Sequence, residues 1–447
     1  MISYKNQLYN KKIIIIGFIV TIMLATISSL NYKHGIILIL LFLVAHIPIM
    51  RNNLYMIYMI LFFLPLHGML THIWLSGNAI YWKEILVLYS FVLTIIKGLD
   101  SKKITIDFVT IIVILYSMFF LVISFGNYNS TITIRGLSVY VLYVAFYFNI
   151  LFSIDDYTKV YRTLIIITIS TILVAIGGIL QSLTQHSFFM TGPIEAKRFN
   201  LVRASFSTGS SIVFGCFMAI IATILFAKLY YGVYNNKNKL LLKLFLFITC
   251  LALILSFTRV AWVQFIISFF VLILLKNWKK SKLVIFFILC SLLITIIYLP
   301  HSNSIVVTFL KEGIHDRSGI WMQSLELFMR NPFTGSGVGS TLWANRDLRN
   351  DEFVSESFFL QLLVETGIIG FCLFISILGV SIFTNCYEGF KSTNELKWLY
   401  FGISGALIGL SINMLFAQAF NSWIINMIFW YLIGLGGVIK KITYDSN

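Results

Sequence analysis

Apolar runs of about 20 residues, separated by short polar segments, follow one another along almost the whole chain. A helix needs about 20 mostly apolar residues to cross the hydrocarbon core of a membrane. The pattern predicts an all-α polytopic membrane protein with about fourteen transmembrane helices. These helices are expected to begin near Ile13, Gly35, Leu54, Ile80, Ile104, Ile134, Tyr161, Ser210, Leu240, Thr258, Leu283, Ser357, Leu396 and Phe420. We expect residues 1–447 to form one integral membrane domain.

One apolar run, residues 240–275, is too long for a single membrane crossing. As one helix it would reach roughly 54 Å, against a hydrocarbon core of about 30 Å. The basic segments KNKLLLK and KNWKKSK flank this run, and basic loops tend to stay in the cytoplasm. The run is therefore predicted to be a helical hairpin that bends near LSFTRVAW, with Arg259 at the outer membrane face.

The composition supports a chain that faces lipid, and the distribution of charge predicts how the chain is oriented in the membrane. Only 11% of the residues are charged, whereas soluble domains carry roughly 25%. The net charge of +16 would fit a nucleic-acid-binding protein, but an excess of lysines in the cytoplasmic loops of a membrane protein explains this charge better. We expect both termini to be cytoplasmic and no nucleic-acid partner. Two long loops, about 183–209 and about 300–356, then lie on the extracytoplasmic side.

Three arginines from separate outer segments, Arg203, Arg259 and Arg317, are predicted to converge on that side. Guanidinium groups bind phosphate through bidentate hydrogen bonds and remain charged. An arginine beside hydrocarbon is costly, so Arg259 is expected to have a functional role, with snorkelling to the interface as the alternative. For Arg203 and Arg317, position alone fits a solvated loop charge equally well.

The segment SGIWMQSLELFMR predicts an amphipathic helix over 318–330 that ends at Asn331–Pro332. Its apolar face suits the membrane interface, where a lipid-linked head group would lie. The face is expected to contain Ile320, Trp321, Leu325 and Phe328. The GSGVGS segment that follows lacks the Gly-Lys-Ser/Thr ending of a phosphate-binding loop, so we interpret it as a turn.

The segment SESFFLQLLVETGIIG starts the next predicted span, with Ser355 as N-cap and Glu356 in the first turn. Glu356 either complements the helix dipole or acts as a general base toward a sugar hydroxyl. Glu365 follows on the opposite helix face, so a glycosidase-type pair of carboxylates is not expected. The outer histidines are too dispersed to indicate a metal site, and no metal or other cofactor is predicted.

Four segments together resemble the O-antigen ligase/O-antigen polymerase (Wzy) family of bacterial membrane glycosyltransferases. They occur in the family's order between Arg198 and Gly370, as RASFSTGSSIVFG, LSFTRVAWVQF, DRSGIWMQSLELFMRNPFTGSGVGS and SESFFLQLLVETGIIG. The resemblance implies transfer of an oligosaccharide from undecaprenyl pyrophosphate to a sugar acceptor, without a nucleotide or metal. It places this reaction at the outer, periplasmic or extracellular, face of the bacterial plasma membrane.

The resemblance also assigns roles to residues. The candidate catalytic residues are Glu356, Arg317, Arg259 and Arg203, with the arginines holding the pyrophosphate. The candidate substrate-binding residues are Arg198, Trp321, His315 and Ser357. Ligases carry a histidine where this chain has SES, a form that resembles the polymerase and capsule-type branch.

We therefore predict a polymerase of lipid-linked polysaccharide repeat units, for O-antigen or capsule. Its expected partners are an undecaprenyl-pyrophosphate-linked oligosaccharide, membrane lipid and a chain-length regulator protein. Two alternatives remain open at this point. One is a ligase that transfers the glycan to a lipid or protein acceptor, and the other is a flippase for the same lipid-linked sugar.

Overall fold

The computed structural model describes residues 53–69, 82–101, 107–125, 130–186, 201–232, 236–276, 315–342, 345, 353–392 and 394–445. All elements in these ranges are helical, with no strand element among them, which confirms the predicted all-α class. The spans expected near Ile13, Gly35 and Leu283 lie outside the described residues, as does Arg198.

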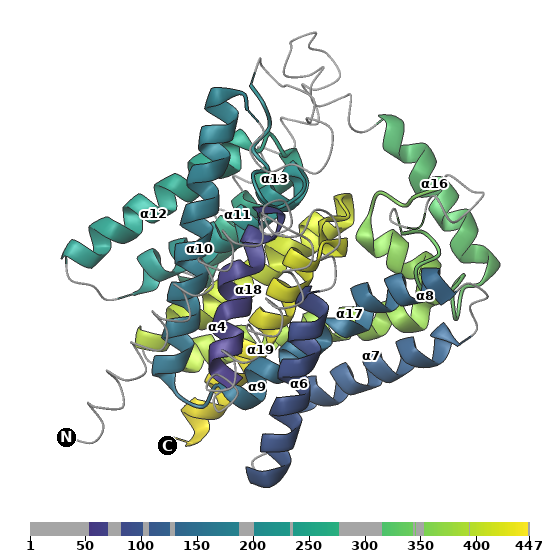
Figure 1. Ribbon diagram of the computed structural model, residues 1–447, viewed down its shortest axis with the longest axis horizontal. Helices are drawn as coiled ribbons and strands as arrows, with labels where there is room; N and C mark the ends of the chain where they lie inside the picture. The colour runs from purple at the N-terminus through teal and green to yellow at the C-terminus, as the bar shows by residue number, and fades with distance from the viewer. Residues whose placement is uncertain are drawn as a thin grey trace, which may run out of the picture.

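The helices pack into one bundle (Figure 1). In chain order they are α4 (Asn53–Phe63), α6 (Trp82–Ser101), α7 (Phe108–Ser124), α8 (Ser130–Leu137), α9 (Val144–Ser153), α10 (Tyr157–Thr184), α11 (Ser211–Tyr231), α12 (Asn236–Leu255), α13 (Arg259–Lys276), α16 (His315–Arg330), α17 (Phe358–Lys391), α18 (Asn394–Phe416) and α19 (Trp423–Asp445). Short 3-10 turns form η1 (Leu64–Leu66) and η4 (Ala419–Asn421), and a π-helix, η2 (Ser138–Leu142), joins α8 to α9.

Eight segments of the described chain are long and apolar enough to cross a membrane. They are Ser130–Ser153, Tyr157–Thr184, Ser211–Tyr231, Asn236–Leu255, Arg259–Lys276, Phe358–Lys391, Leu396–Phe416 and Trp423–Tyr444. Shorter apolar helices occupy Asn53–Met69, Leu86–Ile95 and Phe108–Ser124. These segments are consistent with a polytopic membrane protein, whereas fourteen spans, the topology and a single domain over 1–447 stay predictions.

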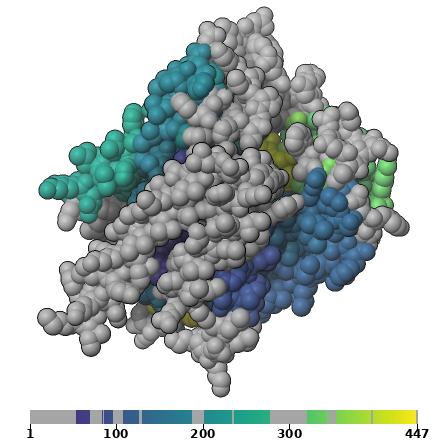
Figure 2. All heavy atoms as spheres, viewed as in Figure 1, coloured from purple at the N-terminus to yellow at the C-terminus, as the bar shows by residue number. Residues whose placement is uncertain are grey.

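The centre of the bundle is formed by helices that are apolar on every side. The spanning windows of α11, α18 and α19 are 78%, 72% and 83% buried, whereas those of α12 and α13 are 22% buried. A helix that is hydrophobic all round belongs in a core, so this difference separates central from peripheral helices. The peripheral α7 forms part of the outer surface, as the blue atoms in Figure 2 show.

The predicted hairpin in residues 240–275 is confirmed. Helix α12 ends at Leu255 and α13 begins at Arg259, so the chain reverses over three residues, Ser256 to Thr258. Phe257 in this bend has a left-handed φ of 49°, which lets the backbone turn sharply. The indole N–H of Trp262 donates to the Leu253 carbonyl at 3.0 Å and ties the two helices together beside the bend.

The described connections of the bundle lie at two opposite ends. Hydrogen bonds join the loop 201–210 both to the α12–α13 bend and to η1. The segment before α17 bonds in turn to the end of α18. Asn413 of α18 donates to Gln264 of α13 at 2.8 Å, and each lies within about one and a half turns of its own helix end. These connections therefore lie at one level, which we call the site end.

The opposite end carries many lysines, and we call it the basic end. The hydroxyls of Tyr157 and Thr443 lie 2.9 Å apart there, and Tyr444 donates to Glu388 at 3.2 Å. These contacts bring together the start of α10, the end of α17 and the end of α19. Lysines at or near this end are Lys228, Lys276, Lys391, Lys397, Lys440 and Lys441.

The predicted helix over 318–330 is confirmed as α16, which begins three residues earlier, at His315, and ends before Asn331 as expected. Its predicted apolar face is partly buried and partly exposed, and a contact of this face with the membrane interface stays a prediction. Trp321 and Phe328 are half-buried and Ser324 is buried, whereas Leu325 is 44% exposed. Spacings of three and seven residues place Trp321, Ser324 and Phe328 toward the bundle, and Leu325 falls on the next stripe, beside the exposed Met322 and Met329.

Helix α17 is broken where the loop after α16 packs into it. Gly367 has φ 64° and ψ −169°, so the helix loses its regular hydrogen bonds at this point. The loop supplies replacements, because Ser336 N donates to the Val364 carbonyl at 2.7 Å and Gly337 N donates to the Glu365 carbonyl at 3.1 Å. In return, Ile368 N donates to the Pro332 carbonyl at 2.8 Å. The kink and the loop therefore form one structural unit.

We predict that Gly367→Ala lowers the thermal unfolding midpoint of the purified protein in detergent. The backbone conformation of Gly367 is essentially restricted to glycine and costs about 1–3 kcal/mol for a residue with a Cβ. That Cβ would also collide with the carbonyl of Phe333. Gly379→Ala in the same helix is the matched control, because a Cβ there meets open space. Equal midpoints for the two variants would contradict this account of the kink.

Candidate functional site

Arg203 lies in the loop 201–210 and binds the α12–α13 bend. Its Nε donates to the Ser256 carbonyl at 3.2 Å, and its Nη2 donates to Thr258 Oγ1 at 3.1 Å. Ala204 N also donates to the Leu255 carbonyl at 2.9 Å. A cation is favourable at the C-terminal end of a helix such as α12, where carbonyls lack helical partners. Arg203 is thus held in a fixed place by the bend.

Arg259 is the first residue of α13 and directly follows Thr258, which accepts a hydrogen bond from Arg203. The structure therefore brings Arg203 against the residue that precedes Arg259, although the two segments are far apart in the sequence. The N-terminus of a helix carries positive partial charge and favours anions. The Arg203 guanidinium beside the start of α13 adds to that charge, so this part of the site end suits an anionic ligand.

The backbone around the two arginines is strained. Phe206 has φ 41° and Phe257 has φ 49°, and left-handed conformations are unfavourable for such large side chains. Gln181 at the end of α10 supports the first of them, because its Oε1 accepts from the backbone N–H of Ser205 and of Phe206. Strained residues of this kind cost of order 1–3 kcal/mol and cluster at functional sites.

Glu356 lies in the segment before α17, and the structure corrects its predicted place. The N-cap is Ser357, whose Oγ accepts from Leu360 N at 3.4 Å, whereas Ser355 Oγ donates to the Ser357 carbonyl at 3.0 Å. Ser357 can cap because its backbone is extended, with φ −109° and ψ 131°. Glu356 therefore precedes the helix and is half-buried at the site end.

Ser357 is almost fully buried, and its hydroxyl also donates to the Met414 carbonyl at 3.2 Å. Both interactions fix the start of α17 against the end of α18. A substrate contact for Ser357 stays a prediction.

The candidate residues Trp321, Arg317 and His315 all belong to α16, so the position of this helix determines where they lie. The rings of Trp321 and Phe416 lie 6.2 Å apart, so α16 contacts the end of α18 at the site end. Arg317 lies one turn before Trp321 in α16, and His315 is the first residue of that helix. The side chains of Arg317 and His315 lie outside the described part of the structure.

Glu365, which the sequence interpretation set aside, is fully buried and accepts hydrogen bonds from four donors. Its Oε2 accepts from the Tyr140 hydroxyl at 2.8 Å and from Gly339 N at 2.9 Å. Its Oε1 accepts from Thr341 N and Thr341 Oγ1, both at 2.8 Å. These bonds occupy backbone amides of the GSGVGST segment, which fits the interpretation of GSGVGS as a turn.

Gln361, one turn before Glu365, extends this network toward the site end. Its Nε2 donates to the Tyr140 hydroxyl at 3.0 Å, and its Oε1 accepts from Gln418 Nε2 at 2.9 Å. The Gln418 amide also donates to the Ser355 carbonyl, next to Glu356. A continuous chain of hydrogen bonds thus runs from the turn at Gly339 to the segment that carries Glu356.

Tyr140 belongs to the π-helix η2, and such single π turns are frequent at functional sites. Sequence reasoning missed Tyr140, Gln361 and Gln418 because no local pattern marks them. A signal was available for Glu365, since an ionisable residue inside an apolar span is rare and usually has a task.

The arrangement offers two cations beside a helix N-terminus and a half-buried carboxylate at the same end of the bundle. Within the described residues, no group of three or more His, Cys, Asp or Glu side chains could hold a metal ion. Metal independence stays a prediction. Chemically, the site end can bind an anion and can accept a proton.

The described structure is that of a polytopic, all-helical membrane protein with a polar, arginine-bearing end. Residues 244–375 match the family described as O-antigen ligase. This range contains most of α12, all of α13 and α16, and the kink of α17, with Arg259, Glu356 and Glu365.

A curated relative, the ComP-specific O-oligosaccharyltransferase of Acinetobacter baylyi, is 26% identical over 369 residues. The alignment takes in 77% of this chain and 65% of the relative, so the chain spans about two-thirds of the relative's length. Both comparisons support the O-antigen ligase side of the predicted resemblance and a glycan-transferring enzyme. The polymerase branch stays a prediction.

We predict that Glu365→Gln lowers the thermal unfolding midpoint and increases hydrogen–deuterium exchange in residues 331–342. The carboxamide of glutamine would place N–H groups against the donors that now bond to the Glu365 carboxylate. Each hydrogen bond to a charged group contributes about 1.5–3 kcal/mol to the stability of the fold. Glu326→Gln makes the same charge change on the exposed surface of α16 and should change neither measurement. Unaltered exchange in the Glu365 variant would show that its carboxylate does not hold the turn.

Proposed function

We propose that this protein transfers an oligosaccharide from a lipid-linked diphosphate to an acceptor hydroxyl. The observation that carries the proposal is the contact between Arg203 and the residue before Arg259, beside the start of α13. A diphosphate is the anion that such a site suits best, because guanidinium groups and helix N-termini both bind phosphate oxygens. The similarity to the O-antigen ligase family in residues 244–375 supports the same chemistry.

The proposed reaction is a displacement at the anomeric carbon of the donor sugar. The acceptor oxygen forms a bond to this carbon while the bond from the carbon to the diphosphate oxygen breaks. Glu356 accepts the proton of the acceptor hydroxyl, and the lipid diphosphate departs with the bonding electron pair. Arg203, Arg259 and, by the family resemblance, Arg317 stabilise the growing negative charge of the leaving group. Arg198, His315, Trp321 and Ser357 are the proposed substrate contacts.

The distribution of charge supports a site on the extracytoplasmic side of a bacterial plasma membrane. Lysines gather at the basic end, as expected for cytoplasmic loops. Lys228 lies 5.4 Å from the ring of Trp398, which matches the aromatic residues found at membrane interfaces. The site end is then the outer end, where a lipid such as undecaprenyl pyrophosphate would present its glycan.

The proposed reaction has two forms, a ligase and a polymerase, which differ in the acceptor that receives the glycan. Transfer to a distinct lipid or protein acceptor agrees with the ligase family and with the oligosaccharyltransferase relative. Transfer to another lipid-linked repeat would make the protein an O-antigen or capsule polymerase and would call for a chain-length regulator as partner. The SES segment at residues 355–357 favours the polymerase by resemblance.

We predict that Arg259→Ala lowers the rate of glycan transfer by about a hundredfold to a thousandfold, because a leaving-group contact is lost. Arg259→Lys should also be strongly impaired, because a lysine keeps the charge but loses the planar fork of donors. The measurement is transfer by purified protein in detergent, at equal amounts of folded protein.

Arg330→Ala is the matched control, since Arg330 is exposed at the end of α16 and should leave the rate unchanged. Glu356→Gln should reduce the maximal rate more than it weakens donor binding. Wild-type rates in both Arg259 variants would remove the arginines from the mechanism.

We predict that the purified protein consumes lipid-linked oligosaccharide in detergent, where there are no compartments for a flippase to connect. Longer lipid-linked glycans as the product would identify a polymerase. Products formed only when a separate acceptor is added would identify a ligase-type transferase. A donor that remains unchanged with either acceptor would contradict glycan transfer altogether.

A further inference from the structure

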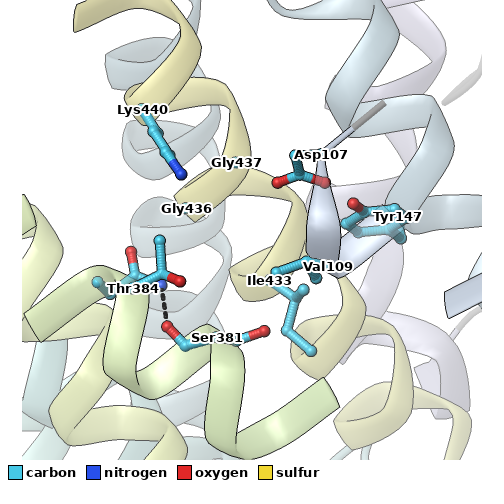
Figure 3. A pocket seen from close by; sticks show the side chains of 10 residues that line it. Asp107, Val109, Tyr147, Ser381, Thr384, Ile433, Gly436, Gly437 and Lys440 are labelled. Atoms are coloured by element: carbon cyan, nitrogen blue, oxygen red, sulfur yellow. Dashed lines mark hydrogen bonds between the residues drawn. The ribbon is translucent and has the colours of Figure 1, made fainter. Parts of the chain in front are cut away.

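A recess at the basic end, well away from the two arginines, is lined by α7, α9, α17 and α19 (Figure 3). Its empty space is about 270 Å³ when the part open to the outside is counted. The enclosed part has room for a group about as large as one water molecule. Nothing in the proposed transfer reaction uses this recess.

Two buried oxygen atoms of α17 line the recess without a hydrogen-bond partner among the described residues. They are Ser381 Oγ and Asn385 Oδ1, and each side chain belongs to a residue only 3% exposed. The Asn385 amide is oriented by its own helix, because Nδ2 donates to the Ser381 carbonyl at 2.8 Å. An unsatisfied buried acceptor costs about 1–3 kcal/mol. The recess therefore presents acceptors that suit a small N–H donor.

A carboxylate and an ammonium group complete the lining. Asp107 caps α7 and accepts from Thr110 N at 2.8 Å through Oδ1. Lys440 of α19 lies on the other side of the opening, as Figure 3 shows. No ion pair within 4.0 Å joins Asp107 to Lys440 in the described structure. The recess thus offers separate places for a positive and a negative group.

Glycine shapes the α19 side of the recess. A Cβ at Gly436 would approach the amide atoms of Asn385 to 2.7 Å, so only glycine leaves this amide its place. Gly437 follows directly and also lines the space. The recess is therefore formed by backbone on one side and by polar side chains on the other.

The surfaces beside the recess are apolar and exposed. Phe108 and Ile111 on α7 are 66% and 47% exposed, and Phe383 and Tyr387 on α17 are 70% and 48% exposed. Large apolar side chains at such positions in a membrane protein contact acyl chains. A ligand in the recess would therefore have its polar group inside and hydrocarbon alongside.

We propose that the recess binds the head group of an aminophospholipid such as phosphatidylethanolamine. The three N–H donors of its ammonium group face Asn385 Oδ1, Ser381 Oγ and the Asp107 carboxylate. Its phosphate lies at the mouth beside the Lys440 ammonium group. Phosphatidylcholine lacks N–H donors and carries a bulkier cation, and phosphatidylglycerol has no cation to meet Asp107. This binding site is independent of the proposed transfer reaction.

The test uses the full-length protein, purified in detergent and stripped of lipid. It is equilibrated with an equal mixture of phosphatidylethanolamine, phosphatidylcholine and phosphatidylglycerol with identical acyl chains, and bound lipid is counted by native mass spectrometry. We expect phosphatidylethanolamine to be retained at least tenfold over phosphatidylcholine. Equal retention of the two would overturn the proposal, as would displacement of the lipid by a tenfold excess of soluble phosphoethanolamine.

Variants test whether the preference for phosphatidylethanolamine comes from the recess. Asp107→Asn keeps a helix-capping side chain but removes the charge, and Ser381→Ala removes one acceptor. Each should reduce the preference for phosphatidylethanolamine over phosphatidylcholine to below about threefold. Lys440→Gln should instead weaken the binding of both lipids to the same extent. Asp155→Asn and Lys441→Gln are matched charge changes outside the recess and should leave the preference intact. A preference that survives Asp107→Asn and Ser381→Ala, with unaltered unfolding midpoints, would place the lipid elsewhere and overturn the proposal.

Discussion

The buried carboxylate of Glu365 holds the site-bearing part of the bundle together. A charge away from water is stable only when its oxygens are fully hydrogen-bonded, and here two backbone amides and two hydroxyls supply those bonds. Three segments distant in sequence become one unit through this side chain, namely η2, the turn at 335–341 and α17. Because α16 leads into that turn and Glu356 leads into α17, both depend on Glu365 for their position.

The two acidic residues of the SESFFLQLLVETGIIG segment therefore lie in different surroundings, and the proton transfer proposed for Glu356 involves only the first of them. Glu365 is fully buried and saturated with donors, which suits a structural role. Glu356 is half-buried before the N-cap of α17, which suits proton transfer. The two arginines also lie in different surroundings. Arg203 is fixed by a hydrogen bond to the Ser256 carbonyl, whereas Arg259 is the first residue of α13, where the helix dipole disfavours a cation.

Periodicity and charge were sufficient to predict much of the fold. The all-helical class, the α12–α13 hairpin and α16 follow from apolar runs and their polar flanks, which are local properties of the chain. Pairings that depend on tertiary structure could not be predicted in this way. Tyr140 and Glu365 are 225 residues apart, and no spacing rule connects them. The N-cap was placed two residues early because Ser355 and Ser357 are equivalent in sequence, and only the backbone conformation distinguishes them.

The charge of the site end runs against the general design of a membrane bundle. Cations are cheapest at the cytoplasmic end of a membrane protein, where anionic lipids and solvent neutralise them, and many lysines of the described bundle gather at its basic end. Arg203 and Arg259 both belong to the site end, at the positive end of α13, where positive charge is unfavourable without a counter-ion. Such a concentration of like charge becomes favourable when an anion lies between the groups. A lipid diphosphate carries enough negative charge to offset both guanidinium groups and reaches the site from the membrane, which links the local electrostatics to the proposed transfer of a lipid-borne glycan.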